Sequence, residues 1–146
     1  MLRHTLLAAV VGMLSSGAAL AQPTACPCVS SATRVNGGDI AALLRGNTVC
    51  AVLGTERWQE FHQVGGQLFE MGNVAGGELA GSWEVALLTR VRYNYGSGGS
   101  YDYAVCTEGS NVHFCGSPFS GRDIPNATLV PGRTNCPGAA RPAASR

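Results

Sequence analysis

The chain contains no lysine, and only 13% of its 146 residues are charged. With ten arginines and nine carboxylates, the formal net charge at pH 7 is +1. This balance argues against a protein that holds nucleic acid or an anionic membrane mainly by charge. The lack of lysine, together with abundant alanine, glycine and arginine, is typical of a GC-rich bacterial genome and indicates no particular mechanism.

Long hydrophobic runs are also missing, so no segment is expected to span a bilayer. The apolar run at residues 6–14 is short, follows Arg3, and is succeeded by small residues ending in Ala19-Leu20-Ala21. This is the pattern of a secretory signal peptide over residues 1–21, cleaved before Gln22. We therefore predict a periplasmic or secreted protein, without a lipid anchor because the residues before Cys26 make a poor lipoprotein box.

Motifs for catalysis are absent as well. Gly96-Ser97-Gly98 lacks the spacing of a nucleophile elbow, no glycine-rich loop joins a strand to a helix, and Glu60 and Glu84 form no obvious acid pair. A cysteine–histidine pair with His62 or His113 is conceivable, but disulfides would consume the thiols. We favour a non-enzymatic protein with no cofactor.

The sequence does contain six cysteines, all beyond the signal peptide: Cys26, Cys28, Cys50, Cys106, Cys115 and Cys136. An even number in an oxidising compartment predicts three disulfides. The strand register described below places Cys106 opposite Cys115, so we predict that these two are bonded. Cys26 and Cys28 are too close in sequence to bond each other comfortably. Each should reach elsewhere, with Cys50 and Cys136 as the remaining partners.

A metal site is the alternative use of these cysteines. Cys26-Pro27-Cys28 and His113-Phe114-Cys115 supply soft ligands. However, no pair has the two-residue spacing of common zinc sites, and an exported protein with an even cysteine count usually forms disulfides. We predict no bound metal, and keep a thiol or metal protein centred on Cys26 and Cys28 as the weakest alternative function.

The remaining sequence suffices for one domain, and twenty glycines with seven prolines favour turns over long helices. We expect an irregular arm at 22–35, a single β domain at 36–136 and a disordered tail at 137–146. One short helix is predicted over residues 40–45, because capping residues precede it and Gly46-Asn47 follows it.

The first predicted hairpin turns at Gly65-Gly66, between strands at residues 57–64 and 67–71. With a two-residue turn, His62 would lie opposite Phe69 and Glu60 opposite Met71. The more apolar face of this hairpin would then carry the following side chains: Trp58, Glu60, His62, Val64, Phe69 and Met71.

Residues 83–95 alternate between apolar and polar types, which predicts a half-buried strand. It is either one long bent strand or two strands joined by a tight turn near Leu87-Leu88. A hairpin folded about Gly98 would pair Tyr95 with Tyr101, Tyr93 with Tyr103 and Val91 with Val105. The same register continues to Cys106 opposite Cys115, with Val112 and Phe114 on the side of Tyr103. The fold class is therefore mainly β: an antiparallel meander forming a small barrel or half-barrel, with one short N-terminal helix and disulfide staples.

Two interpretations of Glu60 and His62 remain open. In one, the strand lies at the rim or is slipped by one residue, and both side chains reach solvent. In the other, they lie inside a small barrel beside Trp58, Tyr93 and Tyr103. Burying a polar group without a partner is costly and is often the mark of a ligand site.

The run from Trp58 through Gly81-Ser82-Trp83-Glu84-Val85 to the paired segments Tyr93-Asn94-Tyr95 and Tyr101-Asp102-Tyr103 resembles a group of small exported proteobacterial proteins. The resemblance covers roughly residues 40–116 and implies a fold rather than a function. A Gly-x-Trp strand is also similar to that of lipocalin-like barrels, although there it lies near the first strand and here it falls in mid-chain.

These observations favour an exported, monomeric binding or interaction module, using a barrel mouth or an aromatic surface. Its partner would be an unknown small molecule or an envelope protein, and not a nucleic acid. The runner-up is an inhibitor-type or envelope protein that docks on another protein through loops at residues 72–80 and 96–100. The candidate ligand-binding residues are Trp58, Glu60, His62, Tyr93 and Tyr103.

Overall fold

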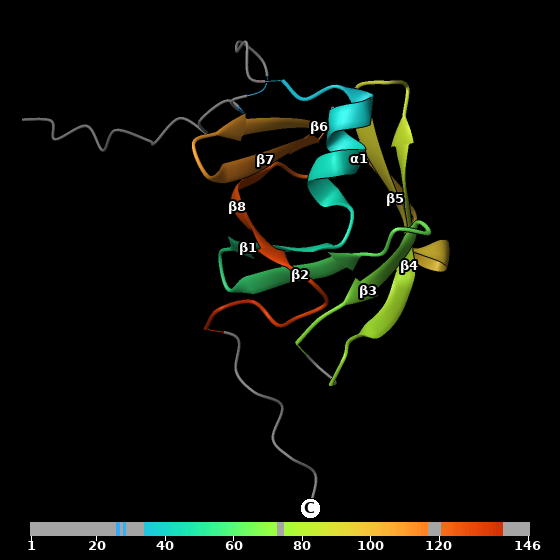
Figure 1. The fold of residues 1–146 in the computed structure, drawn as a ribbon, viewed down its shortest axis with the longest axis vertical. Coiled ribbons are helices and arrows are strands. Elements are labelled where there is room, and N and C mark those ends of the chain that lie inside the picture. The colour runs from blue at the N-terminus through green and yellow to red at the C-terminus, as the bar shows by residue number, and fades with distance from the viewer. Residues whose placement is uncertain (1–25, 27, 29–33, 73–74, 117–120, 139–146) are drawn as a thin grey trace, which may run out of the picture.

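Eight antiparallel strands form a closed barrel in a computed structural model, which describes residues 26, 28, 34–72, 75–116 and 121–138 (Figure 1). Each strand pairs with its neighbours in sequence, and β1 closes the ring by pairing with β8. The expected barrel, short helix and disulfide staples are confirmed. The expected signal peptide, most of the arm and residues 139–146 of the expected tail lie outside the described residues.

The elements follow one another as a simple meander. In chain order they are α1 (Gly37–Leu44), β1 (Asn47–Leu53), β2 (Glu56–His62), β3 (Gln67–Glu70), β4 (Glu78–Ala86), β5 (Arg90–Asn94), the 3-10 turn η2 (Gly96–Gly98), β6 (Ser100–Glu108), β7 (Asn111–Gly116) and β8 (Ile124–Pro131).

The barrel interior is a packed core, filled by alternate residues of the strands. Because successive side chains of a strand point to opposite faces, each strand contributes every second residue to this core. Its fully buried members include Val49, Leu68, Val91, Tyr93, Val105 and Phe114.

Helix α1 lies across one end of the barrel (Figure 1) and contacts β1, β4 and β5. Ile40 and Leu44, one helical turn apart, are fully buried against the barrel core. The N–H of Gly37 donates to the carbonyl of Leu88 at 2.7 Å. A Cβ on Gly37 would lie 3.0 Å from that carbonyl oxygen and 3.1 Å from Val85, so any other residue would have to push these atoms back by a few tenths of an ångström.

The β2–β3 hairpin differs from the predicted register by one residue. Gln63 N–H donates to Gln67 and Gly66 N–H to Gln63, so the loop has three residues with Gly66 at φ +83°. Three-residue loops with a glycine in this conformation are common in hairpins. Phe69 therefore lies opposite Phe61 rather than His62, and Leu68 points inward in its place. Val64, expected on the apolar face, is exposed in the loop.

The β5–β6 hairpin differs from the prediction by two residues. Its loop is centred on Ser97, within η2, and not on Gly98, so Tyr93 lies opposite Tyr101 and Val91 opposite Tyr103. A shift of two preserves the face of every side chain, so the tyrosines still point into the core. The residues 83–95 form two strands, β4 and β5, joined at Leu87-Leu88.

The β6–β7 hairpin is also shifted by two residues, because Gly109-Ser110 forms the turn. Cys106 lies opposite His113, and Cys115 lies opposite Ala104. The predicted Cys106–Cys115 disulfide is therefore wrong, since the two cysteines are diagonal and each bonds to the arm. Val112 and Phe114 share the core with Val105, as expected.

Three disulfides tie the segments outside the barrel to its strands. Cys26 bonds to Cys115 and Cys28 to Cys106, with Cα separations of 5.7 and 5.4 Å. The third disulfide joins Cys50 to Cys136. The expectation that Cys26 and Cys28 reach elsewhere is confirmed, but Cys50 and Cys136 are not their partners. Sequence spacing contains no information about which strand each terminal segment lies against.

Candidate functional site

Strand β2 places Trp58, Glu60 and His62 on the interior of the barrel. The alternation of the strand gives all three the same face, and closure of the sheet turns that face inward. Glu60 is 5% exposed and His62 is fully buried. The interpretation in which both side chains reach solvent is therefore wrong. Along β2, Trp58 lies nearest the end away from α1 and His62 nearest the helix.

Both ring nitrogens of His62 have partners. Nδ1 lies 3.0 Å from the carbonyl oxygen of Glu60, and Nε2 lies 2.9 Å from the hydroxyl of Tyr93. A carbonyl only accepts, so Nδ1 donates to it, and Nε2 of the neutral ring then accepts a hydrogen bond from the Tyr93 hydroxyl. Burial lowers the pKa of His62 to about 4, although its hydrogen bond to the Glu60 carbonyl opposes this. His62 is a neutral, satisfied group of the core.

Glu60 is only half satisfied. Its Oε1 accepts a hydrogen bond of 2.7 Å from the Tyr95 hydroxyl, whereas Oε2 is buried with no hydrogen-bond partner among the described residues. Burial raises the pKa of Glu60 to about 7. The side chains of Tyr95 and Trp58, as hydrogen-bond donors, lower this pKa in part, and the charge of Glu70 raises it further. A buried carboxyl oxygen without a partner is rare and calls for an explanation.

Aromatic rings surround Trp58. Its ring centroid lies 5.6 Å from that of Tyr93, 5.0 Å from Phe114 and 6.4 Å from Tyr103. The first two contacts are edge-to-face, a geometry that aromatic pairs favour. The cluster is therefore fixed by mutual packing and presents Trp58 in a defined orientation.

A hollow of about 180 Å³ opens beside Trp58, at the barrel end away from α1. Trp58 and Tyr103 form its aromatic floor. Charged residues also line the hollow, and two of them, Arg122 and Glu56, form an ion pair. The complete lining is Leu53, Glu56, Arg57, Trp58, Tyr103, Arg122 and Ile124.

The structure brings together the five candidate residues predicted from the sequence. His62 contacts Tyr93, and Tyr93 in turn contacts both Trp58 and Tyr103. Sequence reasoning missed Tyr95, the hydrogen-bond donor to Glu60, although its alternation with Tyr93 was a usable signal. It also missed Arg57 and Arg122, because no sequence pattern indicates that they lie at the same end of the barrel.

A second, larger hollow of about 360 Å³ lies outside the barrel, beside the Cys50–Cys136 disulfide. Val52, Gln59 and Thr128 contribute to its lining. None of the five candidate residues lines it, and Gln59 is engaged, because its side-chain oxygen accepts from the Cys136 N–H. We therefore place the candidate site at the smaller hollow, which Trp58 and Tyr103 line.

Comparison with known proteins does not identify the chain: no protein-family model, no curated protein and no solved structure matches it. Within the part of the chain that the structure describes, no helix has the length and apolar character needed to cross a membrane.

Proposed function

We propose that the protein is an exported binding module whose barrel takes a small molecule at the end away from α1. One observation supports this most strongly: Glu60 Oε2 is buried without a hydrogen-bond partner among the described residues, and Trp58, two residues before it on the same face of β2, lines an open hollow. A ligand that stacks on Trp58 and reaches Glu60 would supply the missing partner. Sites of this kind combine aromatic walls with a few polar groups that fix the orientation of the ligand.

The size and chemistry of the hollow limit the ligand. About 180 Å³ is less than the roughly 300–1,000 Å³ of drug-sized sites, so the ligand is a single ring or a short chain. With a pKa of about 7, the Glu60 carboxyl exists in both protonation states near neutral pH, and can donate or accept a hydrogen bond. Arg57, exposed at the opening, suits an acidic or hydrogen-bond-accepting group at the outer end of the ligand.

The proposal is one of binding without catalysis. Both ring nitrogens of His62 are already engaged, and the six cysteines are all in disulfides. The cysteines are therefore not available as nucleophiles while the disulfides are intact.

Export is part of the same proposal. The Ala-x-Ala ending of residues 19–21 and three disulfides both fit an oxidising compartment. We expect protein recovered from the periplasm or medium to have a mass that corresponds to a chain starting at Gln22. An uncleaved or acylated chain in an intact-mass measurement would contradict this.

Fluorescence of Trp58 tests the binding proposal. Because Trp83 is the second tryptophan, the experiment uses the Trp83→Phe background, in which Trp58 is the only one. Titration with a panel of small aromatic acids, phenols and heteroaromatic amines should give a saturable change for at least one compound. Glu60→Gln should weaken that response about tenfold or more, the effect of losing roughly 1.4 kcal/mol of hydrogen bonding to a carboxylate.

Glu84→Gln is the matched control, because Glu84 is exposed on β4 and does not line this hollow. It should leave the response unchanged. No saturable change with any compound, or equal weakening by Glu60→Gln and Glu84→Gln, would overturn the proposal and favour binding to another protein through the loops.

A further inference from the structure

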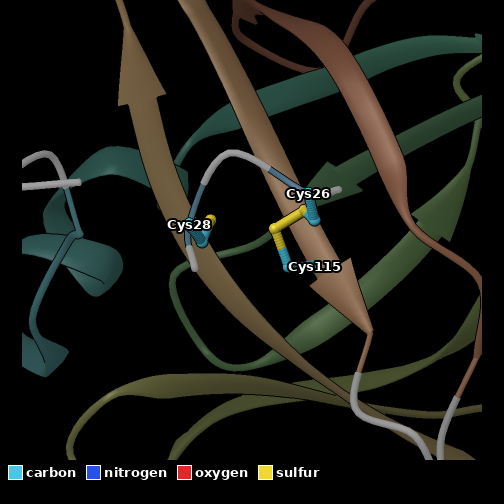
Figure 2. A group of neighbouring side chains, drawn as sticks. All are labelled: Cys26, Cys28 and Cys115. Atoms are coloured by element: carbon cyan, nitrogen blue, oxygen red, sulfur yellow. A yellow bond between two sulfur atoms is a disulfide. The ribbon is translucent and has the colours of Figure 1, made fainter. Parts of the chain in front are cut away.

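Four cysteines gather on the outer face of the barrel, and none of them lines the candidate ligand site. Figure 2 shows Cys26 and Cys28 of the arm over strands β6 and β7, with Cys26 bonded to Cys115. Cys28 bonds to the fourth cysteine, Cys106 of β6. All four are buried, and together with Ala104 they form a small core of their own.

The two disulfides lie next to each other. The sulfur atoms of Cys26, Cys28 and Cys115 all lie within 4.8 Å of one another, although Cys28 belongs to a different disulfide. In a tetrahedral site with zinc–sulfur bonds of about 2.3 Å, neighbouring sulfurs are roughly 3.8 Å apart. Small side-chain rotations would therefore bring these three atoms to coordination distance, and Cys106, bonded to Cys28, is available as the fourth.

The fold, and not sequence spacing, creates this arrangement. The arm brings two cysteines separated by one residue, while β6 and β7 each supply one from positions diagonal to each other. The chain lacks the pair of cysteines separated by two residues that is common in zinc sites. A site assembled from three segments does not need that spacing.

We propose that, once these two disulfides are reduced, Cys26, Cys28, Cys106 and Cys115 form a thiolate site for one Zn²⁺ ion. Reduction takes four electrons and four protons from two equivalents of a dithiol reductant, which is oxidised to its own disulfides. Zinc then binds as the thiols lose their protons to solvent. The metal would hold the arm against β6 and β7 in the reduced protein, as the disulfides do in the oxidised one.

The test uses full-length mature protein, treated with a phosphine reductant without oxygen and then supplied with Zn²⁺ alone. Native mass spectrometry should find one tightly held zinc per reduced chain and none on the oxidised chain. Cys28→Ser should lose this zinc. The double variant Cys50→Ser/Cys136→Ser, which removes the third disulfide and leaves the cluster intact, should keep it.

Thermal unfolding distinguishes a folded site from thiols that bind zinc in an unfolded chain. Zinc should raise the melting temperature of the reduced protein, because a ligand that prefers the folded state stabilises it. The Cys28→Ser variant should show no such rise. The proposal is overturned if zinc gives no increase, or if zinc binding depends equally on Cys28 and on Cys50 and Cys136.

Discussion

Two ionisable residues in the barrel interior, Glu60 and His62, oppose each other in their effect on stability. Burial disfavours the charged form of both, so the pKa of Glu60 rises from 4.5 to about 7 and that of His62 falls from 6.5 to about 4. Between pH 4.5 and 7 the folded state binds more protons at Glu60 than the unfolded state, so this group lowers stability as pH rises. Between pH 4 and 6.5 the folded state binds fewer protons at His62 than the unfolded state, so this group increases stability as pH rises.

We expect this cancellation to be visible in single variants. In the Glu60→Gln variant only the contribution of His62 remains. It should raise the variant's free energy of unfolding by about 3 kcal/mol between pH 4 and 6.5. In the His62→Gln variant only the contribution of Glu60 remains. It should lower the variant's free energy of unfolding by about 3 kcal/mol between pH 4.5 and 7. Urea unfolding at a series of pH values measures both, and parallel profiles for the two variants would contradict the account.

Tyr93 is the residue that connects the polar and aromatic parts of the core. It is fully buried, contacts four aromatic side chains besides His62, and hydrogen-bonds to that histidine. Tyr93→Ala should destabilise the fold by about 3–5 kcal/mol, the cost of truncating a large buried aromatic. Arg92→Ala on the outer face should have a much smaller effect, because it removes a partly exposed ion pair with Asp102 and leaves the aromatic core intact. Equal effects in thermal unfolding would mean that the buried face is assigned wrongly.

Among the elements, the β4–β5 turn is the most unusual. Leu87 and Leu88 have φ values of +52° and +59°, and their side chains are 78% and 81% exposed. This left-handed conformation favours glycine and asparagine, and costs other residues roughly 1–2 kcal/mol each. The strands β4 and β5 stay paired as far as Ala86 and Arg90. Only residues 87–89 are left to link them, which forces a tight turn.

Replacing Leu87-Leu88 with Asn-Gly should therefore stabilise the protein by about 1–2 kcal/mol, since these residues adopt the turn without strain. The carbonyl that accepts from Gly37 is backbone and is retained. Leu79→Asn, which removes another exposed leucine that lacks a positive φ, should bring no gain in thermal unfolding. A lower melting temperature for the turn variant would indicate that the two leucines have stabilising contacts.

The strands before β8 and the faces of their side chains were predictable at this scale, whereas β8 and the register were not. The period-two pattern placed Trp58, Tyr93 and Phe114 in the core, because alternation depends only on neighbouring residues. The register depends on loop geometry, and several glycines in each loop allow more than one turn. The one-residue shift exchanged Phe69 for Leu68 in the core, while the shifts of two residues left the faces unchanged.

For the molecule as a whole, closure of the barrel and pairing of the cysteines depend on contacts distant in sequence. The pairing of β1 with β8 and the three disulfides join residues that are between 78 and 89 positions apart in the sequence. Local patterns contain no signal for such contacts. For the same reason, the sequence placed Glu60 near Trp58 but could not decide whether this face was enclosed.

The disulfide pattern is a direct check of how the termini are attached. Peptide mapping of the oxidised protein should find Cys26 linked to Cys115, Cys28 to Cys106 and Cys50 to Cys136. Because Cys26 and Cys28 are separated by one residue, partial-reduction and alkylation would be needed to assign them individually. A peptide linking Cys106 directly to Cys115 would contradict the observed β6–β7 register.

The central claim is that a closed barrel encloses Glu60 behind Trp58, and the pKa of Glu60 tests it most directly. An NMR titration that follows the side-chain carboxyl carbon, assigned by comparison with Glu60→Gln, reports the protonation of this residue alone. The enclosed site should give a pKa of about 7, raised by burial. A pKa near the ordinary value of 4.5 would show that the carboxylate is in contact with water, and would contradict both the closed interior and the proposed ligand site.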